Sequence, residues 1–170
     1  MKLRLWTVGA LTAAIVIGSS VTVTARKNSR SVRVVEAAIA RIENMDFQGF
    51  ERLLASDASF DNLFALPNTS GTFEGRDAVI ANIREISESF EQMEFVNERV
   101  YEVRGGKTVF VEARGNFTLK GTGEPYQNTY VFAFEINNGK ITAIREYNNP
   151  LTIIQTFNIP FSQSVGSNTK

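Results

Sequence analysis

The chain has 170 residues, enough for one domain with a substantial core, and 43% of them are hydrophobic, with 13 Phe among them. This composition argues against disorder. The sequence contains no cysteine and no histidine, which excludes disulfides, thiolate or imidazole metal sites, and catalytic triads built on His or Cys. Acid–base chemistry is therefore left to carboxylates, Tyr or Lys.

The net charge is zero, but the charges are distributed unevenly along the chain. Residues 1–33 contain six basic residues and no acid, which leaves 12 basic and 18 acidic residues in 34–170. An acidic domain repels nucleic-acid phosphates, and no nucleic-acid-binding motif is present. We therefore expect no nucleic-acid partner.

The first 25 residues are expected to direct export. Lys2 and Arg4 precede a mainly apolar run, and Val23-x-Ala25 resembles a cleavage site, so one expectation is a signal peptide removed after Ala25. The alternative is a retained anchor, because the 21 residues of 5–25 are enough to span a bilayer. In either case the protein is expected to be secreted, periplasmic or attached to a membrane, with a basic linker at 26–33.

Helices are predicted in the first half of the domain, which is expected to span 34–157. Ser31 is the expected N-cap of the first helix, and Asp46 of a short second helix that ends near Leu54. A third helix begins at Asp77. The apolar residues of the first and third helices recur at helical spacing: Val34, Val35, Ala38, Ile39 and Ile42, then Val79, Ile80, Ile83, Ile86 and Phe90.

Strands dominate the second half. The first strand is expected at 58–64, and four more follow the third helix, at 94–104, 108–119, 126–136 and 141–147. One or two helical turns are expected at 151–157, and 158–170 is expected to be a flexible tail. Helices followed by an antiparallel meander predict an α+β domain with its helices on one face of a curved sheet.

The last two strands are joined by Asn138-Gly139, a pair that favours a two-residue type I′ hairpin because both residues tolerate positive φ. Such a loop predicts the cross-strand pairs Ile136–Ile141, Phe134–Ala143, Phe132–Arg145 and Tyr130–Tyr147. One face of this hairpin is then aromatic, and the other carries Ile144 and Glu146.

Three stretches resemble the nuclear transport factor 2-like superfamily, and its SnoaL-like members in particular. They are SDASFD (56–61) at the first strand, GTFEGRDAV (71–79) at the start of the third helix, and NGKI…REYNNP (138–150) at the last hairpin. The resemblance covers roughly 34–157. It implies a conical fold in which the sheet and the helices enclose a mostly apolar pocket for a small hydrophobic molecule.

The resemblance also implies which residues face the pocket. Positions matching Ile144, Glu146 and Asn148 point inward in ketosteroid isomerases and limonene epoxide hydrolase. The aromatic face with Tyr130, Phe132 and Phe134 is then expected on the back of the sheet. Relatives often dimerise there, so a homodimer through Phe132 and Phe134 is predicted.

Glu146 is the foremost catalytic candidate, because it matches a catalytic aspartate of limonene epoxide hydrolase and an apolar pocket raises the pKa of a carboxyl group. Glu112 and Arg114 are the other catalytic candidates. Arg114-x-Asn116 resembles the Arg-x-Asp of the same hydrolase, with Asn in place of the acid. These side chains share one face of their strand, and an alignment one residue away would place Ala113 and Gly115 inside instead.

The remaining ligand-binding candidates are polar or phenolic. Asn62 and Asn149 stand where ketosteroid isomerases and SnoaL-like cyclases carry acids, and an amide cannot shuttle a proton. Tyr126, Tyr130 and Tyr147 can each polarise a carbonyl through a phenol, or simply pack.

Three functions follow from this pattern. The first is a cofactor-independent isomerase, cyclase or hydrolase, the second a module that binds a ligand without chemistry, and the third an interaction domain. The retained Glu146 favours the first, whereas the amides at Asn62 and Asn149 favour the second. No cofactor or metal is expected.

Overall fold

The structure is a computed structural model that describes residues 28–67 and 69–160. The predicted signal peptide or anchor lies outside the described residues, as do residues 161–170 of the tail. Within the described ranges, no helix is long and apolar enough to cross a membrane.

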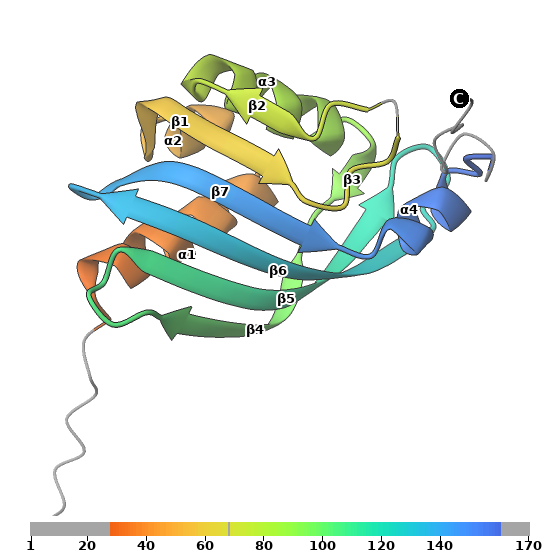
Figure 1. The fold of residues 1–170 in the computed structure, drawn as a ribbon. Helices are drawn as coiled ribbons and strands as arrows, with labels where there is room; N and C mark the ends of the chain where they lie inside the picture. The colour runs from red at the N-terminus through yellow and green to blue at the C-terminus, as the bar shows by residue number, and fades with distance from the viewer. Residues whose placement is uncertain (1–27, 68, 161–170) are drawn as a thin grey trace, which may run out of the picture.

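The α+β prediction is confirmed (Figure 1). The helices are α1 (Arg30–Glu43), α2 (Phe47–Glu51), α3 (Arg76–Ser87) and α4 (Pro150–Thr156). The strands are β1 (Leu54–Asn62), β2 (Thr72–Glu74), β3 (Phe90–Gln92), β4 (Phe95–Glu102), β5 (Thr108–Leu119), β6 (Pro125–Asn137) and β7 (Lys140–Asn148).

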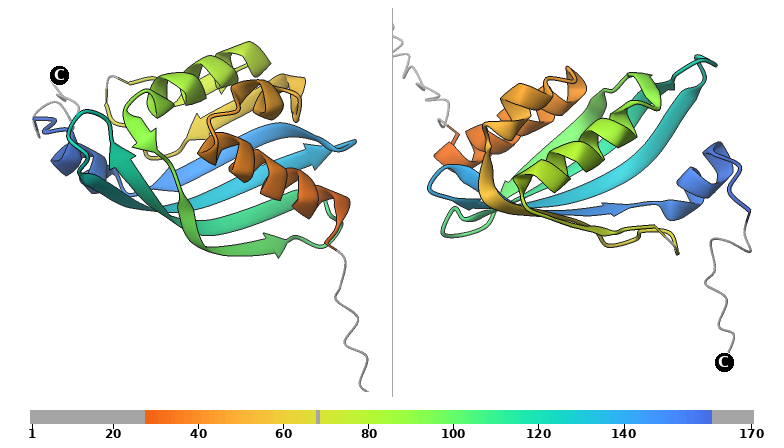
Figure 2. Two further views of the ribbon diagram at one scale, coloured as in Figure 1. Left: turned by 180° about the vertical axis from the view of Figure 1, so that it is seen from behind. Right: turned by 90° about the horizontal axis from the view of Figure 1, so that it is seen from above.

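A single sheet organises the domain. Its strand order is β2-β1-β7-β6-β5-β3, with β4 also paired to β5. All pairs are antiparallel except β1 with β7, which run parallel and place Asn62 beside Glu146. The sheet curves, with α1 and α3 on its concave side and α4 beyond the end of β7 (Figure 2).

Local sequence signals account for the starts of α1 and α2, whereas α3 begins at Arg76, one residue before the predicted Asp77, without a side-chain cap. The Ser29 side chain accepts a hydrogen bond from the Val32 amide (3.1 Å), so α1 is capped two residues earlier than predicted. Ser31 instead donates to the carbonyl of Gly106 in the β4–β5 turn. Asp46 caps α2 as predicted, with its carboxylate accepting from the Gly49 amide (2.8 Å).

The hairpin between β6 and β7 forms at the predicted turn, but its register differs from the prediction. Asn138 and Gly139 both have positive φ (51° and 79°), and Ile136 pairs with Ile141. One additional residue in β7 then shifts the alignment, so that Glu135 pairs with Ala143 and the later pairs follow suit. The observed pairs are Phe134–Ile144, Phe132–Glu146 and Tyr130–Asn148, and the predicted partners of these aromatic residues are wrong.

This bulge moves the aromatic residues of β6 to the concave face, together with Ile144 and Glu146. Tyr130, Phe132 and Phe134 are buried beneath the helices. The prediction that they form an exposed back surface is therefore wrong, and Phe132 and Phe134 cannot carry a dimer interface. The homodimer itself stays a prediction.

The concave face also has a position without a side chain, at Gly115 of β5. A Cβ built there would lie 2.8 Å from Cε2 of Tyr130 and 3.1 Å from Cζ of Phe117, closer than side chains normally pack. Gly115 therefore leaves room for two packed rings.

We expect Gly115→Val to lower the free energy of unfolding by roughly 1–3 kcal/mol, because overpacking forces both rings away from their positions. Arg114→Val is the matched control, since Arg114 is the adjacent residue on the exposed face. Urea denaturation of the two variants measures the difference. Equal midpoints would show that the rings adjust without cost.

Candidate functional site

A cavity of about 240 Å³ lies between the concave face of the sheet and the helices. Most of its lining is apolar or aromatic: Ile39, Ile42, Phe60, Ile83, Ile86, Phe90, Met93, Phe95, Phe117, Phe132, Phe134, Ile144, Ile153 and Phe157. The polar side chains that reach it are Asn62, Ser87, Ser89, Tyr126, Tyr130, Glu146 and Asn148. None of these described lining residues is Lys or Arg.

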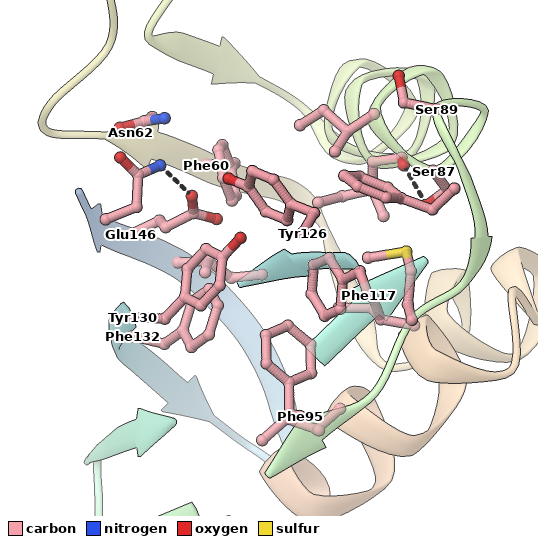
Figure 3. Close-up of a pocket in the computed structure, with 18 of the residues that line it drawn as sticks. Phe60, Asn62, Ser87, Ser89, Phe95, Phe117, Tyr126, Tyr130, Phe132 and Glu146 are labelled. Atoms are coloured by element: carbon pink, nitrogen blue, oxygen red, sulfur yellow. Dashed lines mark hydrogen bonds between the residues drawn. The ribbon is translucent and has the colours of Figure 1, made fainter. Parts of the chain in front are cut away.

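Glu146 is the single acid in this lining, and it projects from β7 into the cavity (Figure 3). Its Oε1 accepts a hydrogen bond from Nδ2 of Asn148 (2.7 Å), two residues along the same face of the strand. Burial raises the pKa of Glu146 to about 7, and the Asn148 hydrogen bond offsets only part of that effect. The carboxyl group can therefore exchange a proton near neutral pH.

Asn148 is itself buried, and only one of its two side-chain polar atoms forms a hydrogen bond. Nδ2 serves Glu146, while Oδ1 has no hydrogen-bond partner among the described residues. A buried acceptor without a donor costs free energy. The cavity therefore holds an acceptor that a ligand can satisfy.

Two tyrosine hydroxyls point toward Glu146 from β6 (Figure 3). Tyr126 and Tyr130 are both buried, and burial, with a contribution from the Glu146 charge, raises the pKa of each phenol above its ordinary value. The phenols therefore remain protonated at neutral pH. Nδ2 of Asn128 donates to the Tyr126 oxygen (2.8 Å), which leaves the Tyr126 hydrogen free to donate to another group.

Asn128 also connects this site to α4. It is 3% exposed, and its Oδ1 accepts from the backbone amide of Asn149 (3.1 Å), the N-cap of α4. The ring of Phe157, directly after α4, lies 6.0 Å from that of Tyr126. The hydrogen bond and the ring contact hold α4 against the cavity.

Six of the residues predicted to bind or react do face the cavity: Glu146, Asn62, Tyr126, Tyr130, Ile144 and Asn148. Asn62 ends β1, and its Oδ1 accepts from the Phe64 amide (3.0 Å). Tyr130 reaches the cavity because of the bulge, and not through the pairing that the sequence predicted.

Glu112, Arg114 and Asn116 do not face the cavity. They lie on the exposed outer face of β5, where Arg99 is 3.9 Å from Glu112 and Asn116 donates to Glu94 (3.2 Å). The alternative alignment is the observed one, since Val111, Ala113, Gly115 and Phe117 point inward and are buried. The prediction that these three side chains face the pocket is wrong.

Tyr147 and Asn149 also lie outside the cavity lining. Tyr147 faces the other side of β7, where its ring packs edge-on against Phe64 with 5.9 Å between the centroids. The Asn149 side chain accepts from the Leu151 amide (3.1 Å) and caps α4. Both residues therefore have structural contacts in place of the predicted contact with a ligand.

Several other residues that line the cavity were not predicted from the sequence to do so. Ile153 lies in α4 and Phe157 directly after it, while Ser87 is the last residue of α3 and Ser89 follows two residues later. The spacing of apolar residues in 150–157 is the one signal in the sequence that could have indicated which side of α4 faces the cavity. The described residues contain no cluster of three acids that could hold a metal ion.

A comparison with protein-family models supports the resemblance to SnoaL-like proteins that the sequence motifs indicated. The SnoaL-like domain model matches residues 35–144, which contain most of α1, all of α2 and α3, and the sheet up to the first half of β7. The chain belongs to the SnoaL-like family. The resemblance found in the sequence motifs is thereby confirmed.

Two curated proteins are similar to this SnoaL-like domain protein. Uncharacterized protein YesE of Bacillus subtilis is 26% identical over 119 residues, which cover 70% of this chain and 81% of YesE. Phenazine biosynthesis protein PhzA of Pseudomonas fluorescens is 33% identical over 78 residues, 44% of this chain and 48% of PhzA. The match therefore spans about half the length of PhzA.

Solved structures share the fold of this SnoaL-like domain. A Bacillus subtilis protein provisionally named an isomerase has a TM-score of 0.70 and 23% identity, covering 76% of this chain and 93% of that one. An LEH-like epoxide hydrolase of M. tuberculosis has a TM-score of 0.59 and 20% identity, covering 74% and 87%. At these identities the likeness establishes the fold alone.

Proposed function

We propose that this SnoaL-like protein binds a small hydrophobic molecule in the cavity and transfers a proton to or from it through Glu146. The observation that carries the proposal is an acid with no basic partner among the described residues, in a mostly apolar cavity and with a pKa near the pH of most cells. A group poised in this way is an effective general acid or base. The reaction class is an isomerisation, cyclisation or hydrolysis.

Tyr126 and Tyr130 would assist by hydrogen bonding to an oxygen of the substrate. Both phenols stay protonated and point toward the carboxyl group. A hydrogen bond from a buried phenol stabilises negative charge that develops on oxygen during proton transfer. The relatives named as an isomerase and an epoxide hydrolase support an enzyme of this kind on the same fold.

A second candidate function is ligand binding without chemistry. It is supported by the amide at Asn62, beside Glu146 in the sheet, because an amide cannot serve as the second acid of an epoxide-type mechanism. The cavity lining contains Glu146 as its single acid. Glu146 alone can accept a proton and return it, as an isomerisation requires, but the described lining residues offer no second acid for a two-acid mechanism.

The experiment is a screen of small hydrophobic ketones, epoxides and enols against the full-length chain and its Glu146→Gln variant. For an enzyme, Glu146→Gln is expected to lower turnover by roughly 10²–10⁴-fold while ligand binding remains. Glu74→Gln is the control, because Glu74 is exposed on β2, outside the cavity lining. Binding without turnover in all three proteins would contradict catalysis and support the binding module.

We also propose that the protein works outside the cytoplasm, directed there by residues 1–25. The support is the basic start followed by the apolar run. Mass spectrometry of the mature protein distinguishes the two forms. A first residue at Arg26 indicates cleavage, and an intact Met1 in the membrane fraction indicates an anchor.

A further inference from the structure

Two oxygens beside the Tyr126 and Tyr130 hydroxyls, Oε2 of Glu146 and Oδ1 of Asn148, receive no hydrogen bond from the described residues. The described residues give the Glu146 carboxyl group one hydrogen bond, to Oε1, and none to Oδ1 of Asn148. Asn148 is 8% exposed, so water reaches its side chain poorly. A ligand that reaches these two oxygens can satisfy them by bringing hydrogen-bond donors.

No described residue places a positive charge beside Glu146 either. The titratable groups that face Glu146 are the phenols of Tyr126 and Tyr130 on β6, and neither phenol can become a cation. The other elements around the cavity contribute apolar side chains, the hydroxyls of Ser87 and Ser89, and the amide of Asn62. Ionised Glu146 would therefore lie in the cavity as an uncompensated negative charge, which is costly in an apolar setting.

The walls of the cavity suit an organic cation better than an anion. The ring centroid of Phe95 lies 5.2 Å from that of Phe117 and 5.5 Å from that of Phe132. Tyr130 stacks on Phe132, with 5.4 Å between the ring centroids. Aromatic rings attract ammonium groups through their electron-rich faces. A carboxylate or phosphate ligand would instead meet Glu146, and the described part of the lining offers no Lys or Arg to bind it.

We propose that the ligand of this cavity is a hydrophobic amine, held as its ammonium between Glu146 and Oδ1 of Asn148. The proposal rests on the proposed function and names the substrate class for it. An ammonium group offers the missing charge and several N–H donors at once. At about 240 Å³, the cavity is slightly smaller than typical ligand pockets of roughly 300–1,000 Å³, which fits a ligand with one ring.

Proton transfer completes the pairing. A neutral amine enters the cavity while Glu146 is protonated, the O–H bond of Glu146 breaks, and its proton forms a new N–H bond to the nitrogen lone pair. The products are a carboxylate and an ammonium ion in contact, so atoms and charges balance. This route avoids transferring two separate ions from water into the cavity.

The test compares benzylamine with benzyl alcohol and benzoate, which share the ring but differ in charge, by calorimetry on the full-length chain. At pH 8, benzylamine is expected to bind at least tenfold more tightly than benzyl alcohol, and benzoate more weakly than either. Glu146→Gln should abolish the preference for the amine, whereas Glu74→Gln should retain it. Asn148→Leu, which removes the unsatisfied oxygen, should weaken benzylamine more than benzyl alcohol.

The pH dependence provides a second readout. Benzylamine affinity should fall about tenfold per pH unit below about 7, where Glu146 must first lose its proton, and should fall again above the pKa of the amine. In the Glu146→Gln variant, the fall in benzylamine affinity below about pH 7 should be absent. A flat profile in wild type would overturn the proposal.

The outcomes separate this inference from the proposed function. If benzyl alcohol binds in the cavity as tightly as benzylamine, the amine proposal is wrong, but a hydrophobic ligand site remains. If none of the three probes binds, while the variants remain folded, the hydrophobic site of the proposed function fails as well.

Discussion

Replacing Glu146 with Gln is expected to make the protein more stable at pH 8, by up to roughly 3 kcal/mol, and no more stable at pH 4. The variant keeps the size of the side chain and an oxygen that can accept from Asn148, but it cannot ionise. A stabilising mutation of a buried polar residue is unusual. It is expected where the native residue is retained for function at a cost in stability.

The direction of this change in stability follows from the pKa values of Glu146 in the folded and unfolded states. Glu146 has a pKa of about 7 in the folded protein, above the ordinary 4.5 that it has when unfolded. Between these values the folded state binds more protons than the unfolded state, so wild-type stability falls as the pH rises from about 4.5 to about 7. Each unit of pKa difference corresponds to about 1.4 kcal/mol, which gives the upper bound above.

Denaturation at pH 4, 5, 6, 7 and 8 measures this effect as a difference between the variant and wild type. The difference should grow across the series and level off above pH 7. Glu74→Gln, which removes an exposed carboxylate, should follow the wild-type curve. A Glu146→Gln curve parallel to wild type at every pH would mean that the carboxyl group is solvated like any surface acid.

Phe132→Glu is expected to destabilise the fold strongly, by about 3 kcal/mol or more. The ring of Phe132 is 8% exposed, stacks on Tyr130 at 5.4 Å and lies opposite Glu146 in the sheet. The variant would lose that packing and place a second carboxyl group beside the first in an apolar cavity. Loss of a buried aromatic ring alone costs about 3–5 kcal/mol.

The control is Thr129→Glu, on the same strand but exposed on the outer face. It should change the free energy of unfolding by less than about 0.5 kcal/mol. If the sequence-based expectation of an exposed dimer surface were right, Phe132→Glu would instead remain folded and become monomeric. Denaturation and light scattering on the same samples distinguish the two results.

Much of the fold could be predicted because its signals are local. Apolar spacing located α1 and α3, Asp46 fixed the start of α2, and Asn138-Gly139 fixed the last turn. Each of these depends on residues within a few positions of one another. The motif resemblance added the curved sheet and the inward direction of Glu146.

The cavity lining was harder to predict because it depends on register. A two-residue turn determines only the first pair, and one additional residue at the start of β7 exchanges the faces of all that follow relative to β6. Nothing in Ile141-Thr142-Ala143 marks a bulge, since all three residues are tolerated in a regular strand. The aromatic residues of β6 were consequently assigned to the wrong face.

The outer face of β5 was misassigned for a different reason. Glu112, Arg114 and Asn116 alternate with small and apolar residues, and hydrophobic alternation alone correctly favours Ala113 and Phe117 as buried. The motif resemblance favoured the charged set, because it matched residue types at a spacing and not the side of the strand. At this position the physical pattern was the better guide.

The parallel pairing of β1 with β7 determines how the chain can reach its native state. Leu54 pairs with Ile141 and Asn62 with Glu146, so segments more than 80 residues apart in sequence must meet before this part of the sheet exists. The hairpins among β4, β5, β6 and β7 close short loops and can form early, whereas β1 can join only after a large loss of chain entropy. Because Asn62 and Glu146 come from these two strands, the polar end of the cavity is expected to be assembled in the last step of folding, on a timescale of milliseconds to seconds.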